Sequence, residues 1–176
     1  SLALRAMQTL PDAVLNIGVA GAYRRERNPA TLLDICVAQQ EELGDFGRCQ
    51  AQTLLPLSVP NTSTPSSFAL ADGLRLRMTE RLSAQGIPHT SGRFITVNSV
   101  SADRQRGAML LQRYPDALCE NMEGAALARV CVYFNLPFAE MRCISNMVDD
   151  PDRQQWRLQE ACTRCGMCAE ACHFYQ

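Results

Sequence analysis

The sequence contains no lysine, so all of its positive side chains apart from histidine are arginines. The 17 basic residues are balanced by 18 acidic ones, and the formal net charge is −1 at pH 7. Because phosphate neutralisation needs a surplus of basic residues, we expect no nucleic-acid partner. The sequence also lacks an apolar run close to the roughly 18 residues that a membrane-spanning helix requires, so we expect no membrane partner.

Internal repeats, low-complexity tracts and the basic and apolar regions of a secretory signal are also absent from the sequence. The hydrophobic share of 47% with 20% charged residues is typical of a globular chain and excludes a disordered one. A length of 176 residues fits one domain of ordinary size. These features together predict a globular protein of the cytoplasm.

Cysteine is in excess, with nine residues in two groups. Five are scattered, mostly within apolar stretches, and we interpret them as small buried side chains: Cys36, Cys49, Cys119, Cys131 and Cys143. The other four are Cys162, Cys165, Cys168 and Cys172. Their C-x2-C-x2-C-x3-C spacing is that of the cysteines that ligate iron–sulfur clusters in bacterial ferredoxin modules.

Two interpretations of this run stay open. The short gaps let three thiolates converge on one [4Fe–4S] cluster, and Gly166 permits the tight backbone path that such a site needs. In two-cluster modules, however, the fourth cysteine serves a second cluster, and only four residues follow Cys172. Residues 162–176 resemble the start of the cysteine-rich subunits of the heterodisulfide-reductase type. They are therefore either a cluster site or the truncated or joined remainder of an incomplete module.

Hydrophobic periodicity predicts alternating strands and helices in the rest of the chain. The pattern favours strands over 13–20, 32–40, 93–98, 117–121 and 137–146, helices over 2–9, 74–85, 103–114, 123–135 and 152–160, and a loop over 55–67. Strands separated by helices indicate an α/β fold with a largely parallel sheet covered on both faces. Ligands bind such sheets beyond the carboxyl ends of the strands.

Three segments place polar or small residues at these strand ends. Residues 16–22 bring small side chains after a strand, residues 120–126 place Glu123 at a strand-to-helix junction, and residues 142–146 end a strand with Asn146. Each feature alone also fits an ordinary turn, a helix N-terminal acid or a capping asparagine.

Taken together, the segments resemble the nucleoside phosphorylase and nucleosidase superfamily, whose members cleave purine N-glycosidic bonds. Residues 16–23 are similar to its Asn-x-Gly-x-Ala-Gly turn, 91–97 to its base-stacking strand and 121–126 to its Met-Glu helix start. Residues 142–148, followed by 150–153 and Trp156, are most similar to the futalosine hydrolases. The resemblance covers about residues 5–161. It implies a nucleosidase domain over 1–161 with a three-layer αβα fold and a mixed, twisted sheet.

The resemblance also implies an activity. A futalosine hydrolase releases hypoxanthine and dehypoxanthine futalosine for menaquinone biosynthesis, without a cofactor, and such enzymes are expected to be homo-oligomers. The implied catalytic residues are Glu123, which would hold the ribose hydroxyls and stabilise an oxocarbenium-like state, and Asn146, which would bind the leaving purine. The other implied substrate contacts are Met122 on the ribose, Phe94 and Ile95 on the base, and Val19, Ala20 and Gly21 near the sugar and the attacking water.

Asn146 carries the implied preference for hypoxanthine. Adenine-releasing relatives have an aspartate at this position, whereas an asparagine amide offers the donor and the acceptor that match a 6-oxopurine. This disfavours a nucleosidase acting on methylthioadenosine. Val19 replaces a hydroxyl residue of phosphate-using relatives, which favours hydrolysis over phosphorolysis.

Superfamily members carry roughly 50 further residues ahead of the segment that matches Ser1. Those residues hold the first strand of the sheet and the glutamate that activates the attacking water. We therefore expect a sheet without its first strand, and weak or no turnover by these 176 residues alone. Two other hypotheses remain: an iron–sulfur electron-transfer protein that carries a nucleosidase-like segment, and a non-catalytic nucleoside-binding or oligomerisation domain.

Overall fold

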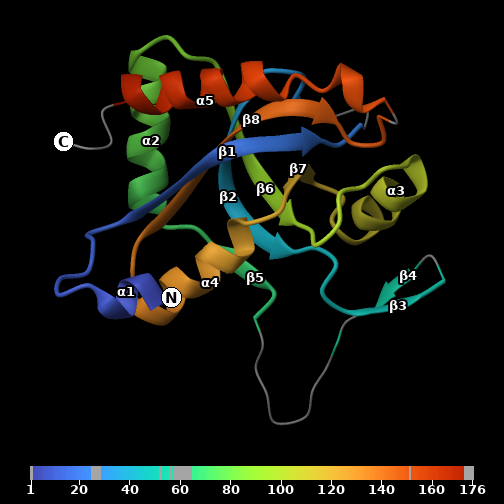
Figure 1. Ribbon diagram of the computed structural model, residues 1–176, viewed down its shortest axis with the longest axis horizontal. Helices are drawn as coiled ribbons and strands as arrows, with labels where there is room; N and C mark the ends of the chain where they lie inside the picture. The colour runs from blue at the N-terminus through green and yellow to red at the C-terminus, as the bar shows by residue number, and fades with distance from the viewer. Residues whose placement is uncertain are drawn as a thin grey trace.

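In the computed structural model, a mixed β-sheet lies between helices (Figure 1). The structure describes residues 2–24, 29–51, 53–55, 57, 65–150 and 152–172. The elements in chain order are α1 (Leu2–Ala6), β1 (Val14–Ala22), β2 (Ile35–Leu43), β3 (Arg48–Gln50), β4 (Thr53–Leu55), β5 (Ser67–Ala69), α2 (Asp72–Ala84), β6 (His89–Thr96), α3 (Arg104–Arg113), β7 (Ala117–Asn121), α4 (Gly124–Phe134), β8 (Phe138–Met147), the 3-10 turn η1 (Arg153–Gln155) and α5 (Leu158–Ala171).

The main sheet has the strand order β5-β2-β6-β7-β1-β8. The pairs β1–β8, β2–β6 and β6–β7 are parallel, whereas β1–β7 and β2–β5 are antiparallel. The first residues of β2 also pair with β8 in antiparallel register, Ile35 opposite Cys143, so the strands from β2 to β8 form a closed ring. The sheet is therefore mixed, as the family resemblance implies. The largely parallel sheet predicted from the hydrophobic periodicity is not found.

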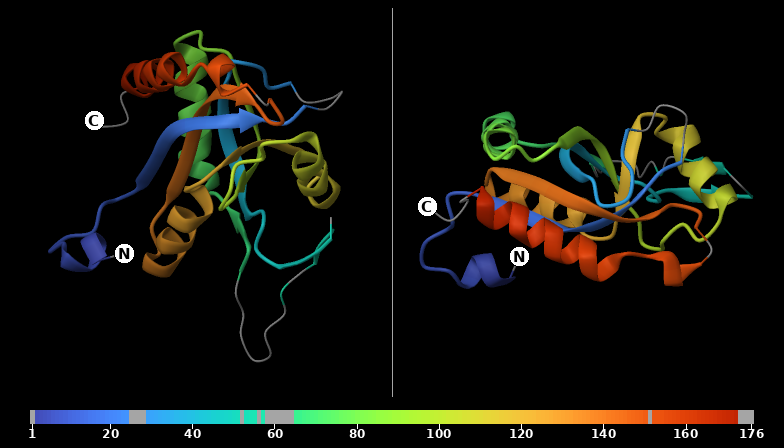
Figure 2. Two further views of the ribbon diagram at one scale, coloured as in Figure 1. Left: turned by 45° about the vertical axis from the view of Figure 1, so that its right-hand side comes forward. Right: turned by 90° about the horizontal axis from the view of Figure 1, so that it is seen from above.

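Helices cover the sheet on both faces (Figures 1 and 2). The alternation of β2 shows how the two layers arise, because successive side chains of a strand point to opposite faces. Ile35 and Val37 pack in a cluster with residues of α2 and α5, whereas Cys36 and Ala38 pack in a cluster with residues of α4. The predicted three-layer αβα fold is confirmed.

The helix α5 is continuous from Leu158 to Ala171 and packs against β1 and β8. The predicted boundary between residues 161 and 162 therefore lies inside one helix. Ala161, Cys165 and Cys168 share a single buried cluster with Met141 of β8. None of the helices in the described part of the chain is both long enough and apolar enough to cross a membrane.

Two local differences from the predicted elements have a physical cause. The strand predicted from residue 32 begins at Ile35, because Asp34 accepts hydrogen bonds from the backbone and side chain of Thr31 in a turn, and Leu33 has a φ of 67°. The strands β3, β4 and β5 have three residues each and are too short to show a periodicity. Most of the loop predicted over 55–67 lies outside the described residues.

Candidate active site

A cavity of about 430 Å³ lies at the carboxyl ends of β1, β7 and β8, beside α5. Its volume is within the range of small-molecule sites. Six of the eight predicted substrate contacts line it: Val19, Ala20, Gly21, Met122, Glu123 and Asn146. The structure therefore brings together residues that are more than 100 positions apart in the sequence.

The parallel pairing of β1 and β8 sets the distance between the first and the last of these segments. Gly21 is the register partner of Asn146, and a Cβ on Gly21 would lie 2.9 Å from Asn146 Nδ2. Ser145 donates a hydrogen bond from Oγ to Asn146 Oδ1, at 2.9 Å. The amide of Asn146 is therefore held beside the glycine backbone, where it still offers a donor and an acceptor.

Glu123 lies at the start of α4 with 59% of its side chain exposed. Its Oε2 is 3.1 Å from Nη1 of Arg142, whose own side chain is only 4% exposed. Gly18 leaves room for this guanidinium, because a Cβ there would lie 2.5 Å from Nη1. The ion pair orients the Glu123 carboxylate at the cavity, as binding of two neighbouring hydroxyl groups requires.

Glu120 also lines the cavity, but its oxygens are already occupied. Oε1 accepts from the backbone N–H of Ser101 at 2.8 Å, and Oε2 accepts from the hydroxyls of Ser101 and Tyr23 at 2.7 and 3.0 Å. Burial, followed by the nearby Glu120 carboxylate, raises the pKa of Tyr23 well above its usual value. Glu120 therefore connects β7 through hydrogen bonds to the end of β1 at Tyr23 and to the segment after β6 at Ser101.

The model of the phosphorylase superfamily matches residues 1–173. This chain belongs to the phosphorylase superfamily. It is 30% identical over 150 residues to the futalosine hydrolase of Streptomyces coelicolor, covering 85% of this chain and 60% of that protein. It is 26% identical over 141 residues to the 5′-methylthioadenosine/S-adenosylhomocysteine nucleosidase of Staphylococcus saprophyticus, covering 79% and 58%.

A futalosine hydrolase mutant from Helicobacter pylori has the same fold as this phosphorylase-superfamily chain. The TM-score is 0.77 at 21% sequence identity, with 92% of this chain and 68% of that chain covered. The chain spans about 60% of the length of the S. coelicolor relative.

Two predicted contacts of this superfamily member do not reach the cavity. Phe94 and Ile95 of β6 are fully buried in the core and are not among the lining residues. The same strand instead leads to Val97, Val100 and Ser101, which do line the cavity. Sheet strands covered on both faces bury both alternating sides, so the lining residues come from the segment beyond the strand end.

Other lining residues come from β7 and β8 themselves and from the segment that follows β8. Asn121 and Arg142 lie within the motifs that carry the resemblance, but no role could be given to them from the sequence. Trp156 and Arg153 form part of the wall, with the guanidinium carbon of Arg153 5.1 Å from the centre of the indole ring. Trp156 Nε1 is buried and has no hydrogen-bond partner in the described part of the chain.

The cysteine run of this superfamily member does not fit a cluster. Cys162 is exposed, whereas Cys165 and Cys168 of α5 and Cys172 at its C-terminal end are buried in the core. Burial raises the pKa of Cys165 to about 11 and also raises the pKa of Cys168 and Cys172. No group of three potential metal ligands comes together among the described residues. An iron–sulfur cluster needs converging thiolates, which this helix does not present.

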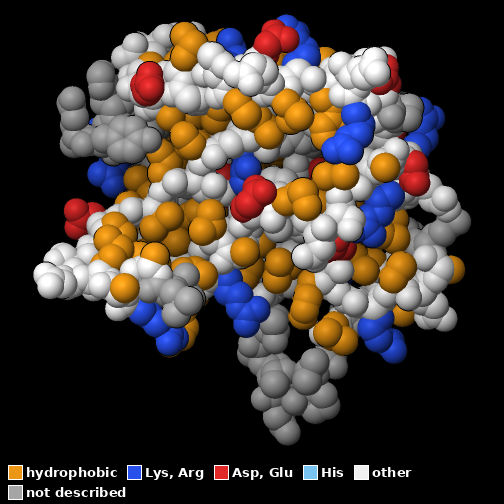
Figure 3. All heavy atoms as spheres, in the orientation of Figure 1, with side chains coloured by type: hydrophobic (Ala, Val, Ile, Leu, Met, Phe, Trp, Pro, Cys, Tyr) orange, Lys and Arg blue, Asp and Glu red, His pale blue; other side chains and the backbone are white. Residues whose placement is uncertain are grey.

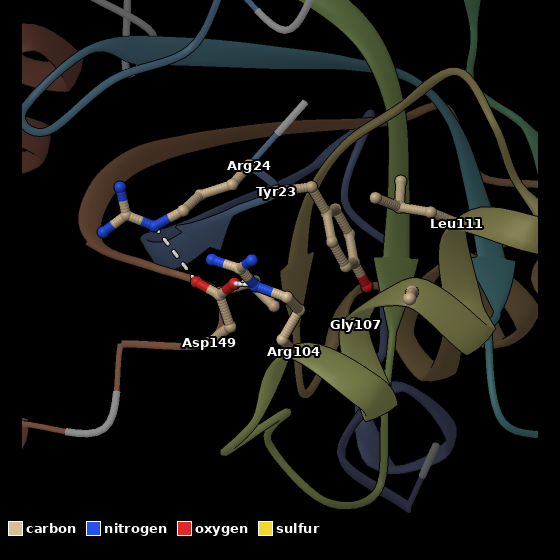
Figure 4. A pocket seen from close by; sticks show the side chains of 8 residues that line it. Tyr23, Arg24, Arg104, Gly107, Leu111 and Asp149 are labelled. Carbon is tan, nitrogen blue, oxygen red and sulfur yellow. Dashed lines mark hydrogen bonds and ion pairs between the residues drawn. The ribbon is translucent and has the colours of Figure 1, made fainter. Parts of the chain in front are cut away.

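A smaller cavity of about 270 Å³ lies between the end of β1, the turn after β8 and α3 (Figure 4). Asp149 lies between two guanidinium groups at its rim, with Arg24 Nε at 3.0 Å and Arg104 Nε at 3.5 Å. The ring of Tyr23 and the side chain of Leu111 line the interior of this cavity. The ion pairs connect the segment after β1, the turn after β8 and the start of α3.

Proposed function

We propose that this chain carries the nucleoside site of a purine N-ribohydrolase. The observation that carries the proposal is the cavity in which the carboxylate of Glu123 and the amide of Asn146 face the same space. Cleavage of an N-glycosidic bond develops positive charge on the ribose and negative charge on the departing purine. A site for this reaction therefore needs a carboxylate on the sugar side and a hydrogen-bond donor on the base side.

Glu123 is the acid that is suited to the sugar. Arg142 orients its carboxylate, yet Glu123 is exposed enough to accept hydrogen bonds from the 2′- and 3′-hydroxyls. The same negative charge stabilises an oxocarbenium-like ribose. Met122, which is 48% exposed beside it, offers a soft, polarisable contact to the ring.

Asn146 favours hypoxanthine as the leaving base and futalosine as the substrate. Its amide can donate to N7 or O6 of a 6-oxopurine and accept from a ring N–H, whereas an adenine site benefits from an acid. The similarity to the futalosine hydrolase of S. coelicolor supports this assignment, and the similarity to a methylthioadenosine nucleosidase makes adenine release the alternative. In our proposal water cleaves futalosine to hypoxanthine and dehypoxanthine futalosine, and no cofactor takes part.

We expect this chain to bind nucleosides better than it hydrolyses them. Glu120 and Glu123 are the acids among the described lining residues, and Glu120 already accepts three hydrogen bonds. Glu123 is assigned to the sugar, so neither acid is available to activate water.

Calorimetric titration of the purified chain with inosine and with free hypoxanthine tests the proposal. We expect both ligands to bind, and we expect Glu123→Gln to weaken inosine binding by at least about tenfold, because a hydrogen bond to a charged group contributes about 1.5–3 kcal/mol. The affinity for free hypoxanthine should stay unchanged, since the base does not contact Glu123.

A matched control is Glu80→Gln, which removes an exposed carboxylate from α2. It should leave both affinities unchanged. The proposal is wrong if the wild-type chain binds neither inosine nor hypoxanthine, or if Glu123→Gln binds inosine as tightly as wild type. A clear preference for adenine over hypoxanthine would replace futalosine with the methylthioadenosine type of substrate.

A further inference from the structure

Two buried acids, Glu41 of β2 and Glu140 of β8, lie behind the candidate site. Both side chains are fully buried. They face each other at the start of α4, where a Cβ on Gly124 would lie 2.1 Å from Glu41 Oε1 and 2.5 Å from Glu140 Oε2. Both carboxyl groups therefore lie against the same glycine, where a proton on one would let it donate to the other. A hydrogen bond between two carboxyl groups requires a proton on one of them.

Of the two carboxylate oxygens of Glu140, one accepts hydrogen bonds and the other has no donor among the described residues. Its Oε1 accepts from Arg142 Nε at 2.7 Å and from Asn16 Nδ2 at 3.0 Å. Its Oε2 is buried and has no donor among the described groups if both acids are ionised. Because an unsatisfied buried oxygen costs about 1–3 kcal/mol, a proton on Glu41 that points to this oxygen completes the arrangement.

The charges that face the pair lead to the same assignment. The ionisable groups that face the pair are Arg142 of β8, Glu123 at the start of α4 and Cys119 of β7. The polar groups are Asn16 of β1, which donates to Glu140, and Asn121 of β7 and Thr96 of β6, which donate to Glu41. Arg142 is the cation that Glu140 and Glu123 share. An ionised Glu41 would be a second buried carboxylate with no cation of its own, which is strongly unfavourable.

The directions of the pKa shifts agree with this geometry. Burial, and then the charge of Glu140, raises the pKa of Glu41 well above its usual value. Burial also raises the pKa of Glu140, but Arg142 opposes that effect. Glu41 is therefore the member of the pair that keeps the proton.

We propose that Glu41 is a neutral acid at neutral pH and that, by donating to Glu140, it positions Arg142 and hence Glu123. Arg142 lies between the two glutamates, with Nε on Glu140 and Nη1 on Glu123. A second connection runs through Asn121, which donates to Glu41 and accepts from the backbone N–H groups of Glu123 and Gly124 at 3.0 and 2.7 Å. The effect on nucleoside binding rests on the proposed function, whereas the protonation of Glu41 does not.

The first test measures the proton directly. We expect the infrared spectrum of the folded chain at pH 7 to contain the carbonyl band of a protonated, buried carboxylic acid. Glu41→Gln should remove this band. A spectrum without the band, or a band that survives Glu41→Gln, would overturn the proposal.

The second test uses the dependence of stability on pH. Unfolded Glu41 ionises above about pH 4.3 while the folded residue keeps its proton, so the stability that Glu41 provides below that pH is lost as pH rises. The unfolding constant of wild type, relative to Glu41→Gln, should rise by up to about tenfold per pH unit over this range. Because Glu140 is present in both proteins, its own contribution to the pH dependence of unfolding cancels in the ratio of the two constants. A ratio that is constant between about pH 5 and pH 8 would contradict the assigned proton.

The third test concerns the positioning role. Glu41→Leu removes the donor to Glu140 and should weaken inosine binding by about tenfold while free hypoxanthine binds as before. Glu41→Gln restores a neutral donor and should rescue inosine binding. Glu42→Gln, in the next residue of β2, is the control and should leave inosine binding unchanged, because Glu42 pairs with Arg93 away from the cavity.

The outcomes separate the two proposals. A wild-type chain that shows the infrared band but binds no riboside refutes the proposed function and the positioning role, and leaves the proton on Glu41 in place. A chain that binds inosine, with equal affinity in wild type and Glu41→Leu, refutes only the positioning role. If Glu41→Leu fails to fold, Glu41→Gln alone tests the positioning role. Loss of inosine binding by folded Glu41→Gln would then contradict that role.

Discussion

At the scale of single residues, the site depends on glycines that leave room for polar side chains. Gly18 admits the guanidinium of Arg142, Gly21 admits the amide of Asn146, and Gly124 lies against Glu41 and Glu140. A side chain at any of these positions would meet a polar group that is held by hydrogen bonds. The small residues that follow β1 therefore have a packing reason that does not require a bound ligand.

Gly124→Ala should be the most damaging of the alanine substitutions at these three glycines. Its Cβ would lie 2.1 Å from Glu41 Oε1 and 2.5 Å from Glu140 Oε2, and both acids are fixed in the core. We expect a loss of about 2 kcal/mol or more in the free energy of unfolding, measured by urea denaturation. Gly73→Ala, where the new methyl meets no atom within 4 Å, is the control. Equal stability of the two variants would contradict the packing described for the acid pair.

Much of the cavity could be predicted from the sequence, because its residues lie in contiguous motifs at strand ends. Val19, Met122, Glu123 and Asn146 are of this kind. The burial of Phe94 could not be predicted, since an aromatic side chain in a strand is equally consistent with the core and with a ligand. The Glu41–Glu140 pair is also invisible in the sequence, because β2 and β8 are far apart in the chain and meet only through the closed sheet.

At the scale of elements, the helix α5 explains the cysteine spacing without a cluster. Buried residues recur at three- and four-residue intervals along this helix: Ala161, Cys165, Cys168, Ala169 and Cys172. This is the pattern of a helix face that packs on a sheet. The gaps of two and three residues that suit a cluster also suit a helix, so the spacing alone could not separate the two structures.

Gly166→Ala distinguishes a continuous helix from a cluster-binding loop in this segment. Gly166 lies inside α5, and a methyl group added to its Cα would meet no atom within 4 Å, so alanine should stabilise the protein by about 0.5–1 kcal/mol through its higher helix propensity. Gly86→Ala is a matched control with equal space but a φ of 65°, and it should be destabilising. The measurement is the thermal or urea unfolding of both variants. Destabilisation by Gly166→Ala would indicate a tight non-helical path through the cysteine run.

At the scale of the whole molecule, apolar side chains are exposed on the face that carries α4 and β1. Figure 3 shows hydrophobic side chains gathered on this side of the molecule. The exposed apolar residues of β1 and α4 include Ile17, Leu127, Val132 and Tyr133, and Tyr133 is 71% exposed. Together with the expectation from the family resemblance, this surface supports the proposal of a homo-oligomer.

Tyr133→Glu should weaken self-association. A charge in the centre of an apolar interface is costly to bury, so the variant should sediment as a smaller species than wild type at the same concentration. Leu76→Glu changes an equally apolar, exposed residue of α2 and should leave the mass unchanged. A monomeric wild-type chain, or a wild-type mass for Tyr133→Glu, would contradict the proposed interface.

A crystal structure of the chain with inosine bound tests the central claim most directly. We predict that the ribose lies in the cavity at the ends of β1, β7 and β8, with its 2′- and 3′-hydroxyls on Glu123 and the hypoxanthine edge on Asn146. Inosine bound elsewhere, such as in the cavity beside Asp149, would contradict the account. So would inosine in the predicted cavity with its sugar turned away from Glu123.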